Sequence, residues 1–378
     1  MTDDVDVVVV GAGLMGAAAA WAAARRGTSV LVFEQFEPHH ARGSSHGSAR
    51  IVRRAYGDEL YTRLTGRAFE LWREVELQSG ATLLRMLGGL DFGQRRDVGA
   101  VAAHLADSGV PHELLDATEA ERRWPGMRID GPAVFHAQAG TMNAAGAVDA
   151  FLALATRTGA RVRFSAPVRY LAPRADDRVD VVLDDEVVIA RRVVVAAGGW
   201  VAPLLDGLVE LPPLRVSQQQ IAHFARLDPA APPWPSVIHE GAQRAYHLAG
   251  GRDGGAGDDR KIGLHDWGPV TTADERDGRV DPRGSEAVVA YVRQWLPGLD
   301  PTPRGETTCL YTATPTEDFL LDRVGPVVVC SACSGHGAKF APLIGELCAD
   351  LALDSGAAVP DRFRLAAHAA GRTGAVSL

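Results

Sequence analysis

The chain has 378 residues, of which 46% are hydrophobic and 23% charged, values that are ordinary for a globular protein with room for two domains. Its formal net charge of −8 argues against a nucleic-acid partner and against an anionic membrane surface. No apolar stretch has the length of a membrane span, no secretory leader is visible, and four cysteines suit a reducing compartment, so we expect a cytoplasmic protein without a membrane partner.

Residues 6–34 carry the pattern of a unit that binds a dinucleotide containing ADP. In chain order the pattern comprises an apolar β-branched strand, a Gly-Ala-Gly-Leu-Met-Gly turn, an alanine-rich helix and a second strand, over 7–10, 11–16, 17–26 and 29–33. The second strand ends at Glu34, where a carboxylate can accept hydrogen bonds from ribose hydroxyls.

Each glycine of the turn has an expected task. Gly11 permits a tight turn, Gly13 lets the backbone approach a pyrophosphate, and Gly16 lets the helix and the strand pack closely. The N-terminus of the helix then offers free N–H groups and a partial positive charge to the pyrophosphate. The alternative is a glycine turn that binds nothing.

The rest of the chain alternates between helical and strand patterns. Apolar spacing predicts helices over 60–76, 100–108, 117–123, 147–158, 285–296 and 338–353. Further strands are predicted over 83–92, 162–164, 179–183, 187–190, 193–197, 261–265, 307–312 and 327–329, with a hairpin turn at 184–185. We expect 211–224 to cross into another domain and the Gly/Asp-rich residues 250–259 to form an exposed turn between strands.

Three loops beyond the N-terminal unit are candidates for cofactor contacts. The small hydroxylated residues of 43–53 suit phosphate, and Arg50 and Arg53 are spaced to lie near one helical face. Residues 198–200 follow an apolar strand and offer a second close backbone approach. Residues 334–337 lie between the last strand and the last helix, so this end of the chain is also expected to face the cofactor.

Lysine is scarce. Lys261 and Lys339 are the only lysines, so 37 of the 39 basic residues (39 − 2) are arginine. The two positions that kept lysine are expected to need a compact ammonium or an adjustable pKa, which a guanidinium cannot supply. The alternative is codon bias that left two lysines by chance.

Five motifs in this order resemble the flavin-dependent amine oxidases of the D-amino-acid-oxidase superfamily, in particular the branch of monomeric sarcosine oxidase and N-methyltryptophan oxidase. They are Gly-Ala-Gly-Leu-Met-Gly at 11–16, Gly-Ser-Ser-His-Gly at 43–47 with Arg50 and Arg53, Lys-Ile-Gly-Leu-His at 261–265, Thr-Cys-Leu-Tyr-Thr at 308–312, and Ser-Gly-His-Gly-Ala-Lys-Phe at 334–340. The resemblance covers nearly the whole chain.

The resemblance implies an α/β (α+β) fold with two domains. A Rossmann-like FAD-binding domain would comprise 1–85, 142–215 and 318–378. A substrate domain with an antiparallel sheet would comprise 86–141 and 216–317. The bound partners would be a small amino acid and O₂, and the protein would be a monomer or a weak homo-oligomer.

The resemblance also implies roles for single residues. Lys261 would activate oxygen, Arg53 and Lys339 would bind the substrate carboxylate, and Tyr311 would bond that carboxylate or line the pocket. His265 would lie at the pocket wall and Arg50 beside the flavin. The remaining cofactor contacts would come from Gly11, Gly13, Leu14, Met15, Gly16, Glu34, Ser44, Ser45, His46, Val168, Gly198, Trp200, Cys309, Gly335, His336 and Gly337, with Arg50 and Lys339 again among them.

Cys309 would hold the FAD covalently through a thioether to its 8α carbon; the alternative is a small buried hydrophobe on a strand. Cys330 and Cys333 form a C-x-x-C pair but lack the second pair that a zinc site needs, so no metal is expected.

The implied reaction oxidises the C–N bond of a small secondary, N-methyl or cyclic amino acid, sarcosine-like or pipecolate/proline-like, to an imine while O₂ becomes H₂O₂. Alternatives are a flavin-dependent dehydrogenase with another electron acceptor, a deglycating (fructosyl-amino-acid) oxidase, an NAD-dependent dehydrogenase, or a flavin module without catalysis. The chain departs from the family at Ser48 and Ala49, where an Asp and a Thr are usual. Either Tyr246 or His247 would face the pocket, and the sequence does not identify the amine.

Overall fold

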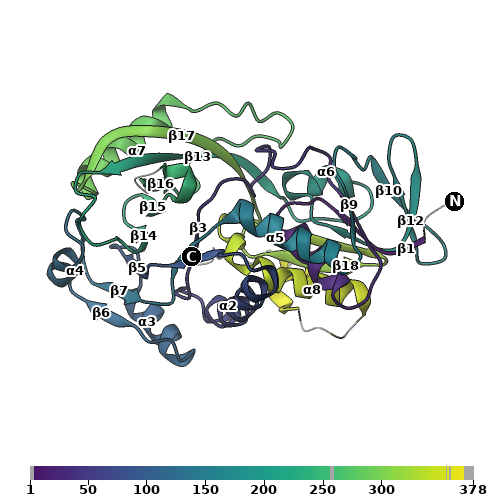
Figure 1. Cartoon of the computed structure of the whole chain (residues 1–378), viewed down its shortest axis with the longest axis horizontal. Helices are drawn as coiled ribbons and strands as arrows, with labels where there is room; N and C mark the ends of the chain where they lie inside the picture. The colour runs from purple at the N-terminus through teal and green to yellow at the C-terminus, as the bar shows by residue number, and fades with distance from the viewer. Residues whose placement is uncertain (1–3, 256–258, 355, 357–358, 370–378) are drawn as a thin grey trace.

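A computed structural model describes residues 4–255, 259–354, 356 and 359–369 of the chain (Figure 1). One end of the molecule is a sheet covered by helices α1, α5 and α8, and the other end is dominated by a second large sheet with helix α7 on its outer face (Figure 1). The predicted α/β (α+β) class with two large sheets is confirmed.

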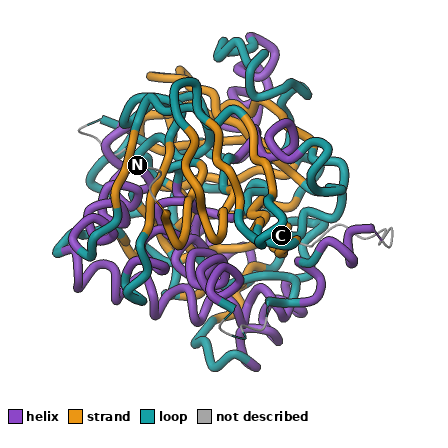
Figure 2. Tube along the Cα trace, turned by 90° about the vertical axis from the view of Figure 1, so that its right-hand side faces the viewer, coloured by secondary structure: helices purple, strands orange, loops and turns teal. Residues whose placement is uncertain are grey.

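The first sheet contains the predicted dinucleotide unit. Its parallel strands are apolar on both sides, because α1, α5 and α8 cover one face and strands β10 and β11 with the short helix α6 cover the other. Figure 2 shows strands on the face turned to the viewer. The strand order is β10 (Tyr170–Pro173), β11 (Val179–Val182), β12 (Val187–Val195), β1 (Asp4–Val10), β2 (Val30–Phe33) and β9 (Arg161–Arg163), while β19 (Val327–Ser331) pairs with β12 and with β18 (Leu320–Val324).

The second sheet is mostly antiparallel, and its two faces have different surroundings. The outer face packs on α7 (Pro282–Trp295) through residues such as Phe224, Ile262 and Val288. The inner face turns toward the first sheet. The strand order is β17 (Leu299–Ala313), β13 (Arg215–Arg226), β16 (Arg260–Leu264), β15 (Arg244–Ala249), β14 (Ser236–Glu240), β5 (Gly89–Phe92), β7 (Ala133–His136) and β6 (Glu113–Leu115).

The remaining elements connect the two large sheets. A third, small sheet joins β3 (Arg50–Val52), β8 (Gly140–Met142) and β4 (Leu84–Met86). The helices are α1 (Leu14–Ala24), α2 (Glu59–Ser79), α3 (Val98–Asp107), α4 (Ala117–Arg123), α5 (Ala144–Arg157), α6 (Val201–Leu205), α8 (Ala341–Leu353) and α9 (Leu365–Ala369), with 3₁₀ turns η1 (Gly198–Trp200), η2 (Gly251–Gly254), η3 (Gly337–Phe340) and η4 (Asp361–Phe363). Among the described residues, no helix combines the length and the apolar character needed to span a bilayer.

Several predicted elements differ from the structure. Residues 211–224 are not a simple crossing but mostly strand β13, which pairs with β17 along nearly its whole length. Residues 187–190 and 193–197 were expected as two strands, yet 187–195 form one, because the ladder to β1 continues past the polar residues between them.

The helical placement of Arg50 and Arg53 is also wrong, since β3 pairs with β8. The expected exposed turn at 250–259 lies between β15 and β16 and is exposed in part: Arg252, Asp253 and Gly255 are exposed, Gly250, Gly254 and Asp259 are buried, and 256–258 lie outside the described residues. The residue boundaries of two domains stay a prediction; strands of the first sheet come from 4–33, 161–195 and 320–331.

Helices α1 and α8 pack at very short distance because both present small residues. A Cβ atom added to Gly345 of α8 would lie 2.5 Å from the backbone carbonyl atoms of Ala18 in α1. These atoms belong to a helix backbone and cannot move aside cheaply.

The Gly345→Ala variant should therefore lower the free energy of unfolding by about 1–3 kcal/mol, the usual cost of overpacking, although alanine is the better helix former by about 1 kcal/mol. Denaturant unfolding would measure the change. Gly99→Ala in α3 is the control, because its Cβ would meet only the Asp97 side chain at 3.5 Å. Equal stability of the two variants would contradict the close packing.

Candidate active site

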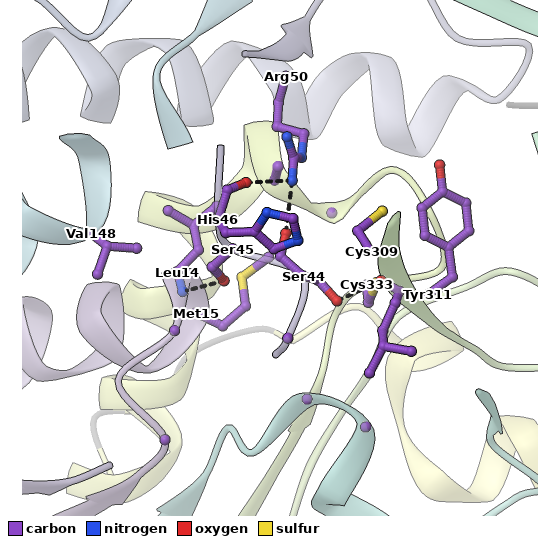
Figure 3. Close-up of a pocket in the computed structure, with 18 of the residues that line it drawn as sticks. Leu14, Met15, Ser44, Ser45, His46, Arg50, Val148, Cys309, Tyr311 and Cys333 are labelled. Atoms are coloured by element: carbon purple, nitrogen blue, oxygen red, sulfur yellow. Dashed lines mark hydrogen bonds between the residues drawn. The ribbon is translucent and has the colours of Figure 1, made fainter. Parts of the chain in front are cut away.

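A cavity of about 480 Å³ lies where the carboxyl ends of the first sheet's parallel strands meet the inner face of the second sheet. This is the place where open α/β sheets bind ligands. The structure brings every predicted site residue to the cavity wall except Gly16. Figure 3 shows part of this wall.

The glycine turn leaves no room for a Cβ atom at Gly11 or at Gly16. Gly11 has φ +99°, and a Cβ there would lie 2.6 Å from the Ala196 carbonyl oxygen. A Cβ on Gly16 would lie 1.8 Å from the Gly11 carbonyl oxygen, so Gly16 serves the packing of helix against turn rather than the cavity wall. Gly13 and Leu14 line the cavity at the N-terminus of α1, where backbone N–H groups favour an anion.

Glu34 is buried at the end of β2. Its carboxylate accepts hydrogen bonds from the N–H groups of Ala12 (2.8 Å) and Phe36 (3.1 Å), and His40 lies 3.4 Å away. Burial alone would raise the pKa of Glu34, but the hydrogen bonds from His40 and the two N–H groups outweigh it and lower that pKa. The carboxylate stays charged, and its hydrogen bond with the Ala12 N–H connects the glycine turn to the end of β2.

Arg50 organises the loop before β3. Its guanidinium donates to the carbonyl oxygens of Ser44 (3.0 Å) and His46 (2.7 Å), so its charge and the loop stay together at the cavity (Figure 3). Burial, with the charge of Arg50, lowers the pKa of His46 to about 4. The neutral His46 ring has no hydrogen-bond partner for Nε2 among the described residues, so this atom remains available to a ligand.

Lys261 projects from β16 and is 6% exposed. Its ammonium donates to the Ala49 carbonyl oxygen at 3.0 Å. Burial, followed by the charge of Arg50, lowers the pKa of Lys261 to about 7. The group therefore titrates close to neutrality.

A second group of basic side chains lies around Asp91, and of these Arg53 and Lys339 line the cavity. Arg53 (3.1 Å) and Arg96 (2.6 Å) both donate to one oxygen of Asp91, and all three side chains are at most 6% exposed. Lys339 is equally buried, and Arg53 lies close enough to act on its charge. Asp91 acts on the charges of Arg96 and Lys339, and Glu240 also acts on Arg96.

Lys339 is held by a hydrogen-bond chain whose direction follows from the partners. His336 Nε2 faces the Glu317 carbonyl oxygen at 3.0 Å and must donate, so its Nδ1 accepts from the Tyr56 hydroxyl at 3.2 Å. The Tyr56 oxygen in turn accepts from Lys339 Nζ at 2.9 Å. Burial, with the charge of Lys339, lowers the pKa of His336 and keeps its ring neutral.

Tyr246 and Tyr311 share a hydrogen bond at the cavity wall, and burial raises the pKa of both phenols. A Cβ on Gly263 would lie 2.5 Å from the Tyr246 hydroxyl oxygen, so the absence of a side chain at Gly263 leaves room for the Tyr246 ring. His265 lies beside Tyr311, with ring centroids 5.6 Å apart, and 3.7 Å from Glu317. Of the two residues left open by the sequence, Tyr246 lines the cavity, whereas His247 is buried against Arg260.

Sequence reasoning missed Tyr56, Asp91, Arg96 and Glu317. Asp91 offered one signal, because it is a lone acid between Leu90 and Phe92 in an expected strand and such a residue needs a buried partner. The other three carry no local signal. No group of three or more His, Cys, Asp or Glu side chains suited to a metal occurs within the described part of the chain.

The cavity fits FAD on observations of this chain alone. The glycine turn keeps a bare backbone at a helix N-terminus, and the cavity continues from it past Glu34 and His46 to Cys309. Cys309 is half-buried on β17.

Comparisons with known proteins agree with this geometry. A family model for FAD-dependent oxidoreductases of the DAO type matches residues 6–351. Monomeric sarcosine oxidase of Streptomyces avermitilis is 36% identical over 97% of this chain and 99% of its own length. N-methyl-L-tryptophan oxidase of Yersinia pestis is 32% identical over 93% of this chain and 95% of its own.

Among solved structures, NikD, an unusual amino acid oxidase essential for nikkomycin biosynthesis, superposes with a TM-score of 0.85 at 29% identity. The match covers 100% of this chain and 99% of that one. The chain therefore belongs to the DAO family of FAD-dependent oxidoreductases.

Proposed function

We propose that this protein is an FAD-dependent oxidase of small secondary or cyclic amino acids. The observation that carries the proposal is the pair of buried basic side chains in the cavity wall, Arg53 and Lys339, for which Asp91 is a shared neighbouring carboxylate. Buried cations are costly unless an anion completes them, so the site suits a substrate carboxylate. The names of the relatives, sarcosine and N-methyl-L-tryptophan oxidases, point to the same class.

Bound FAD would supply the two-electron oxidation of the substrate C–N bond and the transfer of those electrons to O₂, which forms H₂O₂. The protein's residues bind, orient and hold protons. Arg53 can bind the carboxylate through two parallel hydrogen bonds, and Lys339 can bind it as a point charge. Burial lowers the pKa of Lys339 well below its usual value, and a carboxylate bound beside it would favour its charged form.

The part of the wall next to Asp91 suits a small aliphatic amine. Ile221, Ile238 and Leu248 line the cavity beside Tyr246 and Tyr311, whose neutral phenols leave an oxygen lone pair for an amine N–H. The Lys261 ammonium, which titrates near neutrality, would stabilise negative charge on oxygen as it is reduced.

Two finer features belong to the proposal. Cys309 would carry the FAD covalently, since this half-buried thiol lines the cavity. A reducing, cytoplasmic location is supported by the free state of Cys309, Cys330, Cys333 and Cys348.

Acid precipitation of the purified protein tests the covalent bond. The yellow absorbance should stay in the pellet of the unaltered protein and move to the supernatant in Cys309→Ala, because only the thioether survives unfolding. Cys333→Ala is the matched control, since this thiol lines the same cavity but burial raises its pKa. Yellow supernatant from the unaltered protein would remove Cys309 from this role.

Removal of one pocket cation tests the carboxylate site. Arg53→Met should weaken binding of amino-acid substrates and of amine-free carboxylate inhibitors at least about 30-fold, since loss of one partner of a buried charge pair costs about 2–5 kcal/mol. Titration of flavin absorbance with the inhibitor measures it. Arg54→Gln is the control, because Arg54 donates to Thr65 (2.8 Å) and Gln138 (3.0 Å) and does not line the cavity.

Lys261→Met tests the oxygen step. The variant should react with O₂ about 100-fold more slowly or worse, because a fixed charge beside the developing anion is lost, while anaerobic reduction by substrate changes far less. Stopped-flow absorbance separates the two steps. A variant that reacts with O₂ as fast as the unaltered protein would favour a dehydrogenase that passes electrons to another acceptor.

A further inference from the structure

Lys261 is surrounded by charged and titratable groups from five parts of the chain. Arg50 from β3, Cys309 from β17 and Asp253 from η2 act on its ammonium. Lys261 in turn acts on His46 from the glycine-rich loop and on His223 from β13. Arg50 opposes the charged form of Lys261, and Asp253 is the carboxylate that favours it.

Asp253 is attached to the cavity loop by a pair of reciprocal hydrogen bonds. Its carboxylate accepts from the Ser48 N–H at 2.5 Å, and its own N–H donates to the Ser48 hydroxyl at 3.0 Å. The next residue, Ala49, provides the carbonyl that accepts from Lys261 Nζ. Adjacent residues of one segment therefore hold the carboxylate and the ammonium.

Gly47 makes this arrangement possible. Its φ is +86°, and a Cβ there would lie 3.0 Å from the Asp253 carboxylate and 3.5 Å from the Arg50 guanidinium. The carboxylate thus lies at the same turn as the cation that opposes the charge of Lys261.

We propose that Asp253 is a positioning residue that keeps Lys261 protonated through its negative charge, so that the turn η2 sets how readily the site reduces oxygen. The effect on the proton of Lys261 depends only on this geometry. The consequence for oxygen rests on the proposed oxidase function.

The sign of the effect follows from the charges. Burial and Arg50 lower the pKa of Lys261 to about 7, while Cys309 and, after it, Asp253 oppose this shift. Without the carboxylate, the pKa of Lys261 falls further and a smaller fraction is protonated at neutral pH. If Asp253 acted only by holding the loop through its hydrogen bond with Ser48, Asn would serve as well, because its amide oxygen can accept from the Ser48 N–H.

The scarcity of lysine makes a direct test practical. Protein labelled with [ε-¹³C]lysine and purified with its cofactor has two labelled side chains, Lys261 and Lys339, which Lys339→Arg assigns. In Asp253→Asn the midpoint of the Lys261 ¹³Cε titration should move down by about one pH unit, the lower end of the effect expected of a nearby opposite charge.

Asp228→Asn is the matched control. Its exposed carboxylate also accepts a backbone N–H, from Ala230 at 2.9 Å, and does not line the cavity. It removes the same charge from the protein and should leave the midpoint of Lys261 unchanged.

An unchanged Lys261 midpoint in Asp253→Asn overturns the proposal. Ser48→Ala removes the hydroxyl that accepts from the Asp253 N–H but keeps the Asp253 carboxylate, so it should shift the Lys261 midpoint less. A shift as large as that of Asp253→Asn would mean that the hydrogen bonds between Ser48 and Asp253, and not the charge, control Lys261. The titration needs no substrate and decides the matter even in a protein without oxidase activity. In an active oxidase, the pH dependence of the reaction with O₂ should shift down by the same amount in Asp253→Asn.

Discussion

The burial of basic side chains around Asp91 is the constraint on which the rest of the site depends. Arg53 and Arg96 both donate to Asp91, and Lys339 Nζ donates to two neutral acceptors, the Tyr56 hydroxyl and the His336 carbonyl oxygen. Such an arrangement is unfavourable until an anion arrives. Trp72 Nε1 from α2 donates to the Lys339 backbone carbonyl oxygen at 2.8 Å and so anchors the backbone from which this side chain projects.

The two lysines lie in different surroundings, and these surroundings suit them to different roles. Burial, followed by the charge of Arg53, lowers the pKa of Lys339 although Asp91 opposes the shift, and an anionic ligand would favour the charged form further. Lys261 keeps a carboxylate within reach, at Asp253, and titrates near neutrality. An arginine at either place would be charged at all times, which explains why a chain rich in arginine retains lysine here.

The cavity exists because two sheets with different backbone geometry meet. The first sheet contributes strand ends, where loops and a helix N-terminus expose backbone N–H groups. The second contributes one face of its strands. Register pairs Asp91, Ile238, Tyr246, Gly263 and Ile221 in one row across five strands, so a carboxylate, a phenol and apolar side chains face the same space.

The sequence by itself determined the local parts of this protein. The β1–α1–β2 unit with Glu34 was predictable because its strand, turn and helix signals lie within thirty residues, and the two lysines because they are rare. Only the tertiary structure decided what depends on distant pairing. Arg50 and Arg53 do not lie on a helical face, because the segment that begins at Arg50 forms β3, which pairs with β8. Strand alternation allows either Tyr246 or His247 to face the cavity, and the register of β15 with β14 and β16 selects Tyr246. Asp91 likewise meets Arg53 only through the fold, since charge pairing across such separations leaves no trace in local sequence.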